Sequence, residues 1–205
     1  MKIIDISKSI GPQMVLWPDD PKITVTKVSD ITTDKCNVSA VNMGLHAGTH
    51  VDAPWHYIAQ GKKVDELDLS FFCGPCKIFE IKKEAHLSYE ELKDCNIDKG
   101  DIVLFKTRNS YEEKDFFNKE YCALTYSAAQ HLVEKKVKTV GIDYLSIEAY
   151  EGTGDVHKLL LSNEIAVLEG LDLSLVNPGE YLLSALPLKL SGAEGSPVRA
   201  VLIEL

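Results

Sequence analysis

Two consecutive strand–helix–strand units constrain the fold of this chain more than any other feature of its sequence. Apolar runs at Ile102–Lys106, Thr139–Ile142 and Ile165–Leu168 are typical of buried strands. Helical patterns near Thr125–Lys136 and Val156–Leu161 separate them. Strands joined through a helix usually lie parallel in one sheet. The pattern therefore predicts an α/β domain whose sheet is parallel at its centre.

Both ends of the chain are rich in strands and poor in helices, which predicts antiparallel pairing there and a mixed sheet overall. The expected strands are Ile3–Ile6, Ile23–Val28, Val38–Leu45, Lys77–Ile81, Tyr181–Ser184 and Val198–Ile203. Capping boxes at Ser88–Glu91 and Ser127–Gln130 mark two helices, and Asp155 is expected to cap a third. With 205 residues and no linker, residues 1–205 are expected to form a single domain.

Composition limits the classes of partner. The formal charge is −9 and lysine and arginine form no cluster, which argues against nucleic acid or an anionic membrane surface as a partner. No apolar run approaches the ~18 residues of a transmembrane helix. The N-terminus lacks the apolar core of a secretory signal and reads as a strand. We expect a cytoplasmic protein that acts on a small molecule.

The five cysteines, an odd number without framework-like spacing, suit reduced thiols. Cys73-Gly-Pro-Cys76 matches the thioredoxin active-site tetrapeptide, which must open a helix to lower the pKa of its first thiol. Here it precedes Lys77–Lys82, which alternates like a strand. The tetrapeptide is therefore interpreted as a turn, and a redox function is disfavoured.

The segment from His46 to His56 holds three of the six histidines, and Asp52 is its only other ionisable side chain. His46, His50, Asp52 and His56 all occupy even positions, so an extended backbone would direct them to one face. Imidazole nitrogen and carboxylate oxygen suit zinc, manganese or iron(II). The alternative is a turn capped by the aspartate, with its histidines in solvent. The two remaining histidines outside the metal hypothesis, His86 and His131, are expected on the surface.

Three ligands leave coordination positions open, and His157 and Glu169 are the best further donors. Glu169 ends an apolar strand, where a carboxylate is costly to bury unless it meets a cation. His157 lies in the first turn of the preceding helix and can point toward that strand end. A helix-surface histidine and a salt-bridged glutamate explain the two residues equally well, so the residues alone leave this point open.

The segment from His46 to His56 resembles the signature His-x-Gly-Thr-His-x-Asp-x-Pro-x-His of the cyclase-like metal-dependent hydrolases, the family of bacterial kynurenine formamidase (arylformamidase). Every fixed position of that signature is present. Matching features extend over nearly the whole chain: Asp5-Ile-Ser7, Trp17-Pro18, Gly141-Ile-Asp143-Tyr-Leu-Ser146, His157-x-x-Leu160-Leu161, Glu169-Gly170-Leu171, and the closing Leu186-Pro187-Leu188 and Ser196-Pro-Val-Arg-Ala200.

The resemblance implies a swivelling β/β/α domain with a barrel-like mixed sheet flanked by helices, assembled as a homodimer or a larger homo-oligomer. It also implies a site for two divalent ions, Zn²⁺ or Mn²⁺, in each subunit. His46, His50 and Asp52 match the ligands of the first ion. Asp52 bridges to the second ion, which His157 and Glu169 complete. His56 matches the catalytic histidine of the family.

The implied reaction is hydrolysis of a small amide, such as an aryl formamide of the N-formylkynurenine type, by metal-bound hydroxide with His56 as the proton shuttle. Trp17 is a candidate stacking wall for an aromatic substrate, although packing is the commoner role of a lone tryptophan. The alternatives are an ester, lactone or isatin-like cyclic amide as substrate, or a metal-binding protein without turnover. Asp19 stands where arylformamidases commonly have glycine, which puts substrate identity in question.

Overall fold

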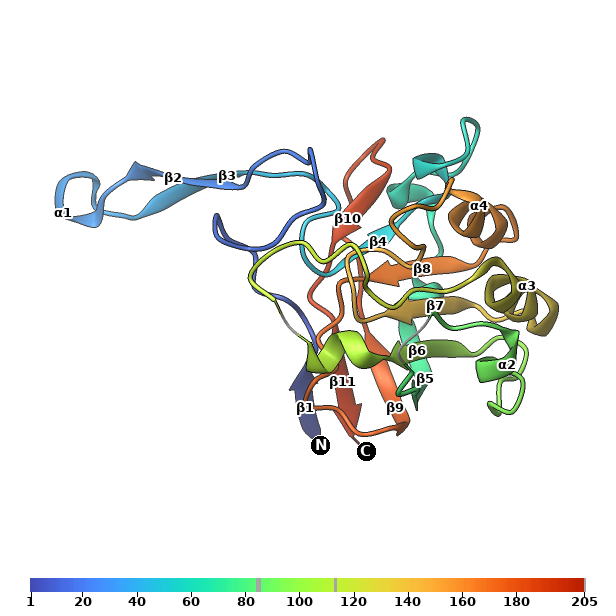
Figure 1. Cartoon of the computed structure of the whole chain (residues 1–205). Helices are drawn as coiled ribbons and strands as arrows, with labels where there is room; N and C mark the ends of the chain where they lie inside the picture. The colour runs from blue at the N-terminus through green and yellow to red at the C-terminus, as the bar shows by residue number, and fades with distance from the viewer. Residues whose placement is uncertain (84–85, 113, 205) are drawn as a thin grey trace.

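The computed structural model of the chain is built around one nine-stranded mixed sheet (Figure 1). It describes residues 1–83, 86–112 and 114–204. The strand order is β1-β11-β9-β5-β6-β7-β8-β4-β10, and the run β5 to β8 is parallel while the other neighbours are antiparallel. The strands are β1 (Lys2–Asp5), β4 (His50–Asp52), β5 (Cys73–Glu80), β6 (Ile102–Lys106), β7 (Thr139–Ile142), β8 (Ala166–Glu169), β9 (Gly179–Ser184), β10 (Gly195–Pro197) and β11 (Val201–Glu204).

The two strand–helix–strand units predicted from the sequence are present. The strands β6 and β7 have the predicted bounds, and the helices α3 and α4 connect β6 to β7 and β7 to β8. The longer helices lie on the same side of the parallel strands (Figure 1). The α-helices that belong to the sheet domain are α2 (Tyr89–Leu92), α3 (Tyr126–Lys135) and α4 (Asp155–Ser162), and 3₁₀ turns span Pro54–His56, Val64–Glu66, Leu69–Phe71 and Arg108–Tyr111.

Alternate residues of the parallel strands supply two separate hydrophobic cores, as the period of two requires. On β6, Val103 and Phe105 face the helices and join the core formed with α3 and α4. Ile102 and Leu104 face the opposite way, into a core closed by the terminal strands and the loops of the other side. The sheet is therefore buried on both faces where it is parallel, and the predicted α/β class with a mixed, barrel-like sheet is confirmed.

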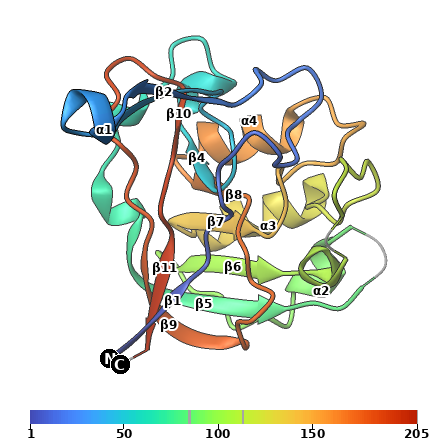
Figure 2. The same ribbon diagram turned by 90° about the vertical axis from the view of Figure 1, so that its left-hand side faces the viewer.

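The two ends of the chain meet in the sheet. Strand β1 pairs antiparallel with β11, from Lys2 opposite Glu204 to Asp5 opposite Val201, and the two termini lie side by side in both views (Figure 2). Strand β11 continues to β9, and β9 to β5. These antiparallel strands cover the core to which Ile102 and Leu104 belong.

The interpretation of Cys73-Gly-Pro-Cys76 as a turn was wrong. These residues begin β5 and pair with β9, with Gly74 opposite Leu183. Pro75 lies in the first part of β5, which pairs with β9 alone because β6 pairs with β5 only from Cys76 onward. A proline is tolerated where one side of a strand has no neighbour. All five cysteines are free, which agrees with the prediction of reduced thiols.

Three local predictions also need correction. The N-cap of α3 is Thr125, whose hydroxyl accepts from Ala128 N, and not Ser127. Asp155 is the first residue of α4, whose N-cap is Gly154 in the left-handed region (φ 82°). His131 is buried against the ring of Tyr89 and is not a surface residue. The capping box from Ser88 to Glu91 is confirmed.

A β-hairpin projects from the sheet domain as a separate arm (Figure 1). It consists of β2 (Thr24–Ser29) and β3 (Val38–Asn42), with the short helix α1 (Ile31–Asp34) at its tip. Both strands are exposed along almost their whole length. Both strands were predicted, with ends that differ by up to three residues from those observed, but no pattern in the sequence predicted that they leave the body of the protein.

Candidate metal centre

The histidine-rich segment is only partly extended. His50 and Asp52 lie on β4 and point to the same face, as the alternation predicts. His46 precedes the strand in a loop that turns at Gly48 (φ 71°), and His56 follows it in the 3₁₀ turn Pro54–His56. The four side chains are therefore gathered by a loop, a strand and a turn, and not by one long strand as the parity of their positions suggests.

Strand pairing brings the distant carboxylate to this segment. Strand β4 lies between β8 and β10, and His50 stands directly opposite Glu169 in the antiparallel register. Thr49, between the glycine and the histidine of the motif, fixes this approach, because its buried hydroxyl donates to Gly170 O at 2.6 Å. Gly170 (φ 67°) must be glycine, since a Cβ there would lie 2.1 Å from Gly48 O.

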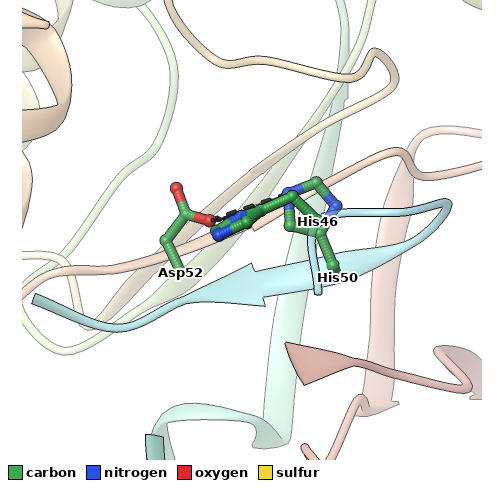
Figure 3. A group of neighbouring side chains, drawn as sticks. All are labelled: His46, His50 and Asp52. Carbon is green, nitrogen blue, oxygen red and sulfur yellow. Dashed lines mark ion pairs between the residues drawn. The ribbon is translucent and has the colours of Figure 1, made fainter. Parts of the chain in front are cut away.

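The five predicted ligands come together in two groups that share one residue. His46, His50 and Asp52 form the first group, and Asp52, His157 and Glu169 form the second, with the ligand atoms of each within 4.8 Å of one another. Figure 3 shows the first group, with both imidazole rings directed at the carboxylate of Asp52. His157 reaches the centre from the first turn of α4, and its Nε2 lies 3.1 Å from Glu169 Oε1 and 3.8 Å from Asp52 Oδ2.

The donor set fits a divalent cation. Among the described residues, His46 Nε2, His50 Nε2 and both Asp52 oxygens are buried without a hydrogen-bond partner of acceptable geometry. Unsatisfied buried polar atoms are costly and rare. His50 Nε2 lies 3.6 Å from Asp52 Oδ1, and the His46 ring faces the same oxygen with its Nδ1 at 2.9 Å, so the group indicates a site for a cation. His50 Nδ1 donates to Gly48 O at 2.9 Å, which leaves the Nε2 lone pair directed at the centre.

The buried carboxylates and histidines of the centre shift one another's pKa values. Burial raises the pKa of Asp52, but the surrounding histidines outweigh it and hold the pKa far below its usual range. Burial opposes protonation of His157, yet hydrogen bonds to Glu148 and Glu169 raise its pKa to about 10. The pKa of His46 is raised in the same way, against burial, by the Asp52 carboxylate. The carboxylates of Asp52, Glu148 and Glu169 thus favour positive charge at this point.

His56 differs from the other histidines of the cluster. Its ring stacks on His46 at a centroid distance of 4.0 Å but belongs to neither ligand group. The side chain reaches solvent, and partial burial lowers its pKa, so the neutral, proton-accepting form prevails at pH 7. These properties suit a group that takes a proton from a water at the centre, and the assignment of that role stays a prediction.

Trp17 lies in a cluster of aromatic rings. Its ring centroid is 5.0 Å from Phe117, 5.5 Å from Tyr150 and 6.3 Å from Tyr121. Asp20, in the same turn, has its pKa raised by burial and partly lowered by His46, His50 and His56, so the turn borders the centre. Asp19 adopts φ 71°, and the loop therefore keeps a backbone typical of glycine although the residue differs.

Two residues near the centre were not predicted from the sequence. Glu148 is buried and bonds His157 Nδ1 at 2.9 Å, and Tyr57 stacks on the His157 ring at a centroid distance of 4.5 Å. Tyr57 follows His56 directly, but no spacing rule distinguishes it from a surface tyrosine. The sequence predicted an acidic cap for α4 and assigned it to Asp155, whereas Glu148 accepts the hydrogen bonds at the start of this helix.

Comparison with known proteins identifies the family. The family model "Cyclase", described as "Putative cyclase", matches residues 4–149. The chain belongs to the cyclase family. It is 37% identical to "Cyclase-like protein 2" of Oryza sativa subsp. japonica over 217 residues, covering 99% of this chain and 79% of that protein. It is 34% identical to the "Kynurenine formamidase" of Salinibacter ruber over 206 residues, covering 98% and 97%.

Solved structures support the same assignment. One described as "predicted metal-dependent hydrolase from Bacillus stearothermophilus" aligns with a TM-score of 0.87 at 33% identity, covering 98% of this chain and 97% of that one. An isatin hydrolase bound to the product analogue thioisatinate, 24% identical with a TM-score of 0.87, shares the fold. This cyclase-family chain is a hydrolase. Of its described helices, none has the length and apolar character needed to span a bilayer.

Gly195 of β10 leaves the room that the His46 ring occupies. A Cβ at this position would lie 2.8 Å from His46 Cε1 and 2.9 Å from Val51 O. We expect Gly195→Ala to displace the His46 ring and to lower the affinity for the first ion about 10-fold. This is within the range found when the orientation of a metal ligand is disturbed. Zn²⁺ titration by calorimetry measures this. Gly11→Ala is the control, because a Cβ there meets nothing within 4 Å, and equal affinities in the two variants would contradict the prediction.

Proposed function

We propose that this protein hydrolyses a small aryl formamide of the N-formylkynurenine type with two divalent ions, Zn²⁺ or Mn²⁺, in each subunit. The observation that carries the proposal is the pair of ligand groups joined through Asp52, because a shared carboxylate is the usual bridge between two ions. The kynurenine formamidases of Salinibacter ruber and of Bacillus cereus, 34% and 33% identical over nearly the full chain, favour an amide substrate.

Each residue has a defined task in this proposal. His46, His50 and Asp52 would hold the first ion, and Asp52, His157 and Glu169 would hold the second. Bound there, divalent ions would supply an acidified water as nucleophile and polarisation of the substrate carbonyl. His56 accepts the proton of the attacking water and returns it to the leaving nitrogen. Trp17 and its aromatic neighbours form a wall for the aryl group.

A substrate panel with metal replacement tests the function. The metal-free protein is reconstituted with Zn²⁺ or Mn²⁺ and assayed on N-formyl aromatic amides, lactones and isatin. The proposal expects the highest kcat/KM on the aryl formamides and no turnover in the presence of excess chelator. A preference for lactones or isatin would replace the substrate class while keeping the metal chemistry. Metal binding without turnover on any compound would refute the catalytic function.

We infer that residues 1–205 form one domain, supported by a sheet that takes strands from both ends of the chain. We infer a cytoplasmic protein whose partner is a small molecule and not nucleic acid, supported by the charge of −9.

We further propose that the protein is a homodimer or larger homo-oligomer, and the projecting arm supports this. An isolated two-stranded hairpin is marginal in water, and this one exposes apolar side chains on β2, α1 and β3: Val25, Val28, Ile31, Val38 and Val41. Within residues 24–42 the arm carries two lysines and two aspartates, so it has no net charge, whereas the whole chain is strongly acidic. We infer that a second copy of this chain covers these apolar side chains, because an exposed apolar surface usually marks a protein–protein contact.

Replacing apolar side chains of the arm with charged ones should separate the subunits. Val25 and Val41 stand opposite each other across β2 and β3, so Val25→Lys with Val41→Glu keeps a favourable cross-strand pair while removing the apolar contact. We expect the mass measured by light scattering to fall from that of an oligomer to that of the monomer. Leu175→Lys, at an exposed apolar residue of the sheet domain, is the control. A mass unaffected by the double change would argue against the arm as the interface.

A further inference from the structure

Glu148 is a buried carboxylate beside the metal centre that belongs to neither ligand group. Its two oxygens accept five hydrogen bonds from consecutive residues. Oε1 accepts from Gly154 N at 2.8 Å and Asp155 N at 3.1 Å. Oε2 accepts from Val156 N at 3.1 Å, His157 N at 3.3 Å and His157 Nδ1 at 2.9 Å. With both oxygens engaged in this way, Glu148 faces the start of α4 and not the centre between the ligand groups.

Four of these bonds satisfy the start of α4. The first N–H groups of a helix have no partner within it, and the positive end of the helix dipole favours an anion there. The N-cap residue Gly154 has no side chain to supply an acceptor. Glu148 supplies it from six residues upstream, and Gly152 leaves it space, because a Cβ at that position would lie 2.4 Å from Glu148 Oε1. The first turn of α4 is therefore built around this carboxylate.

The fifth bond fixes the ring that reaches the centre. Because Nδ1 of His157 donates to Glu148, Nε2 is the atom directed at Glu169 and Asp52. A carboxylate that accepts from the other ring nitrogen of a ligating histidine sets its tautomer and orientation and raises its basicity. One side chain thus holds both the backbone that carries His157 and the ring itself.

We propose that Glu148 is a positioning residue for the second ion, which presents His157 Nε2 to Asp52 and Glu169 and ties ion binding to the order of the first turn of α4. The inference rests on the proposed two-ion function. It predicts a selective effect, because the first group of His46 and His50 has no contact with Glu148 among the interactions described.

The test is a Zn²⁺ titration of the metal-free protein by calorimetry. In Glu148→Gln, one acceptor position becomes an NH₂ group that faces backbone donors, so His157 loses its fixed orientation. We expect the second ion to bind 10- to 100-fold more weakly, the usual cost of removing such a partner, and the first ion to bind as in the wild type. Asp155→Asn is the matched control, since it removes the same charge from the first turn of α4 at an exposed side chain without contact to the ring.

Glu148→Asp keeps the charge at the helix start if Glu148→Gln folds poorly. Its shorter side chain reaches less far toward His157, so we expect a folded protein with a lower affinity for the second ion and an unchanged affinity for the first. If Glu148 had only a structural role, its replacement would lower both affinities equally, and that result would overturn the proposal. Wild-type affinity for both ions in Glu148→Gln would overturn it as well.

A readout that needs no metal separates this inference from the proposed function. In the metal-free wild type, the ¹⁵N spectrum of the His157 ring should show a proton on Nδ1 in a hydrogen bond, and this signature should be lost in Glu148→Gln and kept in Asp155→Asn. If the wild type binds a single ion, the two-ion function fails, whereas the ring spectrum still decides whether Glu148 positions His157. An unchanged ring spectrum in Glu148→Gln would refute the inference by itself.

Discussion

Replacing Asp52 with asparagine should lower turnover by at least about 10³-fold and reduce metal binding at both ligand groups. Asp52 is the one residue that the two groups share, and its two oxygens lie near His50 and His157 respectively. The amide offers one neutral oxygen in place of two charged ones, so neither ion retains its full ligand set. A 10³-fold loss corresponds to about 4 kcal/mol of transition-state stabilisation, which is within what a bound metal ion supplies.

Metal content and rate measured on the same sample decide this prediction. We expect Asp52→Asn to retain less than half of the metal bound by the wild type after dialysis, with kcat/KM reduced in parallel. His46→Ala provides the comparison, because it removes a ligand from the first group only and should spare the second ion. Asp98→Asn controls for the change in charge, because Asp98 is an exposed carboxylate outside both ligand groups. Full metal content in Asp52→Asn would exclude Asp52 as the bridging ligand.

Changing His56 to alanine should reduce kcat by about 10²- to 10⁴-fold, the usual contribution of a positioned acid–base group. Unlike Asp52, His56 lies outside both ligand groups, so we expect metal content to match the wild type. Its ring faces His46 in a stack and reaches solvent, which is the position needed to pass protons between the centre and bulk water.

Added imidazole tests the chemical nature of this loss. A free imidazole that enters the space left by His56 should restore part of the rate in His56→Ala. His86→Ala serves as the control, since His86 is outside both ligand groups and accepts a hydrogen bond from Ala123 N. Loss of metal in His56→Ala would mean that this histidine is a ligand, and an unchanged rate would mean that another group carries the proton.

The sequence alone was sufficient for the strands and helices at the centre of the sheet. Strands β6 and β7 have the predicted bounds because their residues are buried on both faces, and such strands are continuous apolar runs. The edges were harder. The turn predicted at Cys73–Cys76 is a strand because pairing with β9 outweighs the local preference of Gly-Pro for a turn.

The ligand types were predictable from residue chemistry, and their grouping was not. The spacing of His50 and Asp52 places both on one face of β4, which is a local property of extended backbone. His46 and His56 reach the same centre through a loop and a 3₁₀ turn. Their even positions in the sequence are therefore not the reason that they lie close to His50 and Asp52. From the residues alone, His157 and Glu169 were as well explained by a helix surface and a salt bridge.

Only the tertiary structure decided how the centre is completed. Glu169 stands opposite His50 because β4 pairs with β8 across more than a hundred residues of sequence, and register between distant strands depends on the packing of the whole sheet. Glu148 joins the site because its buried carboxylate lies at the start of α4, where four backbone N–H groups need an acceptor. The sequence determined which side chains are able to bind a cation, and the long-range pairing of the fold determined where they meet.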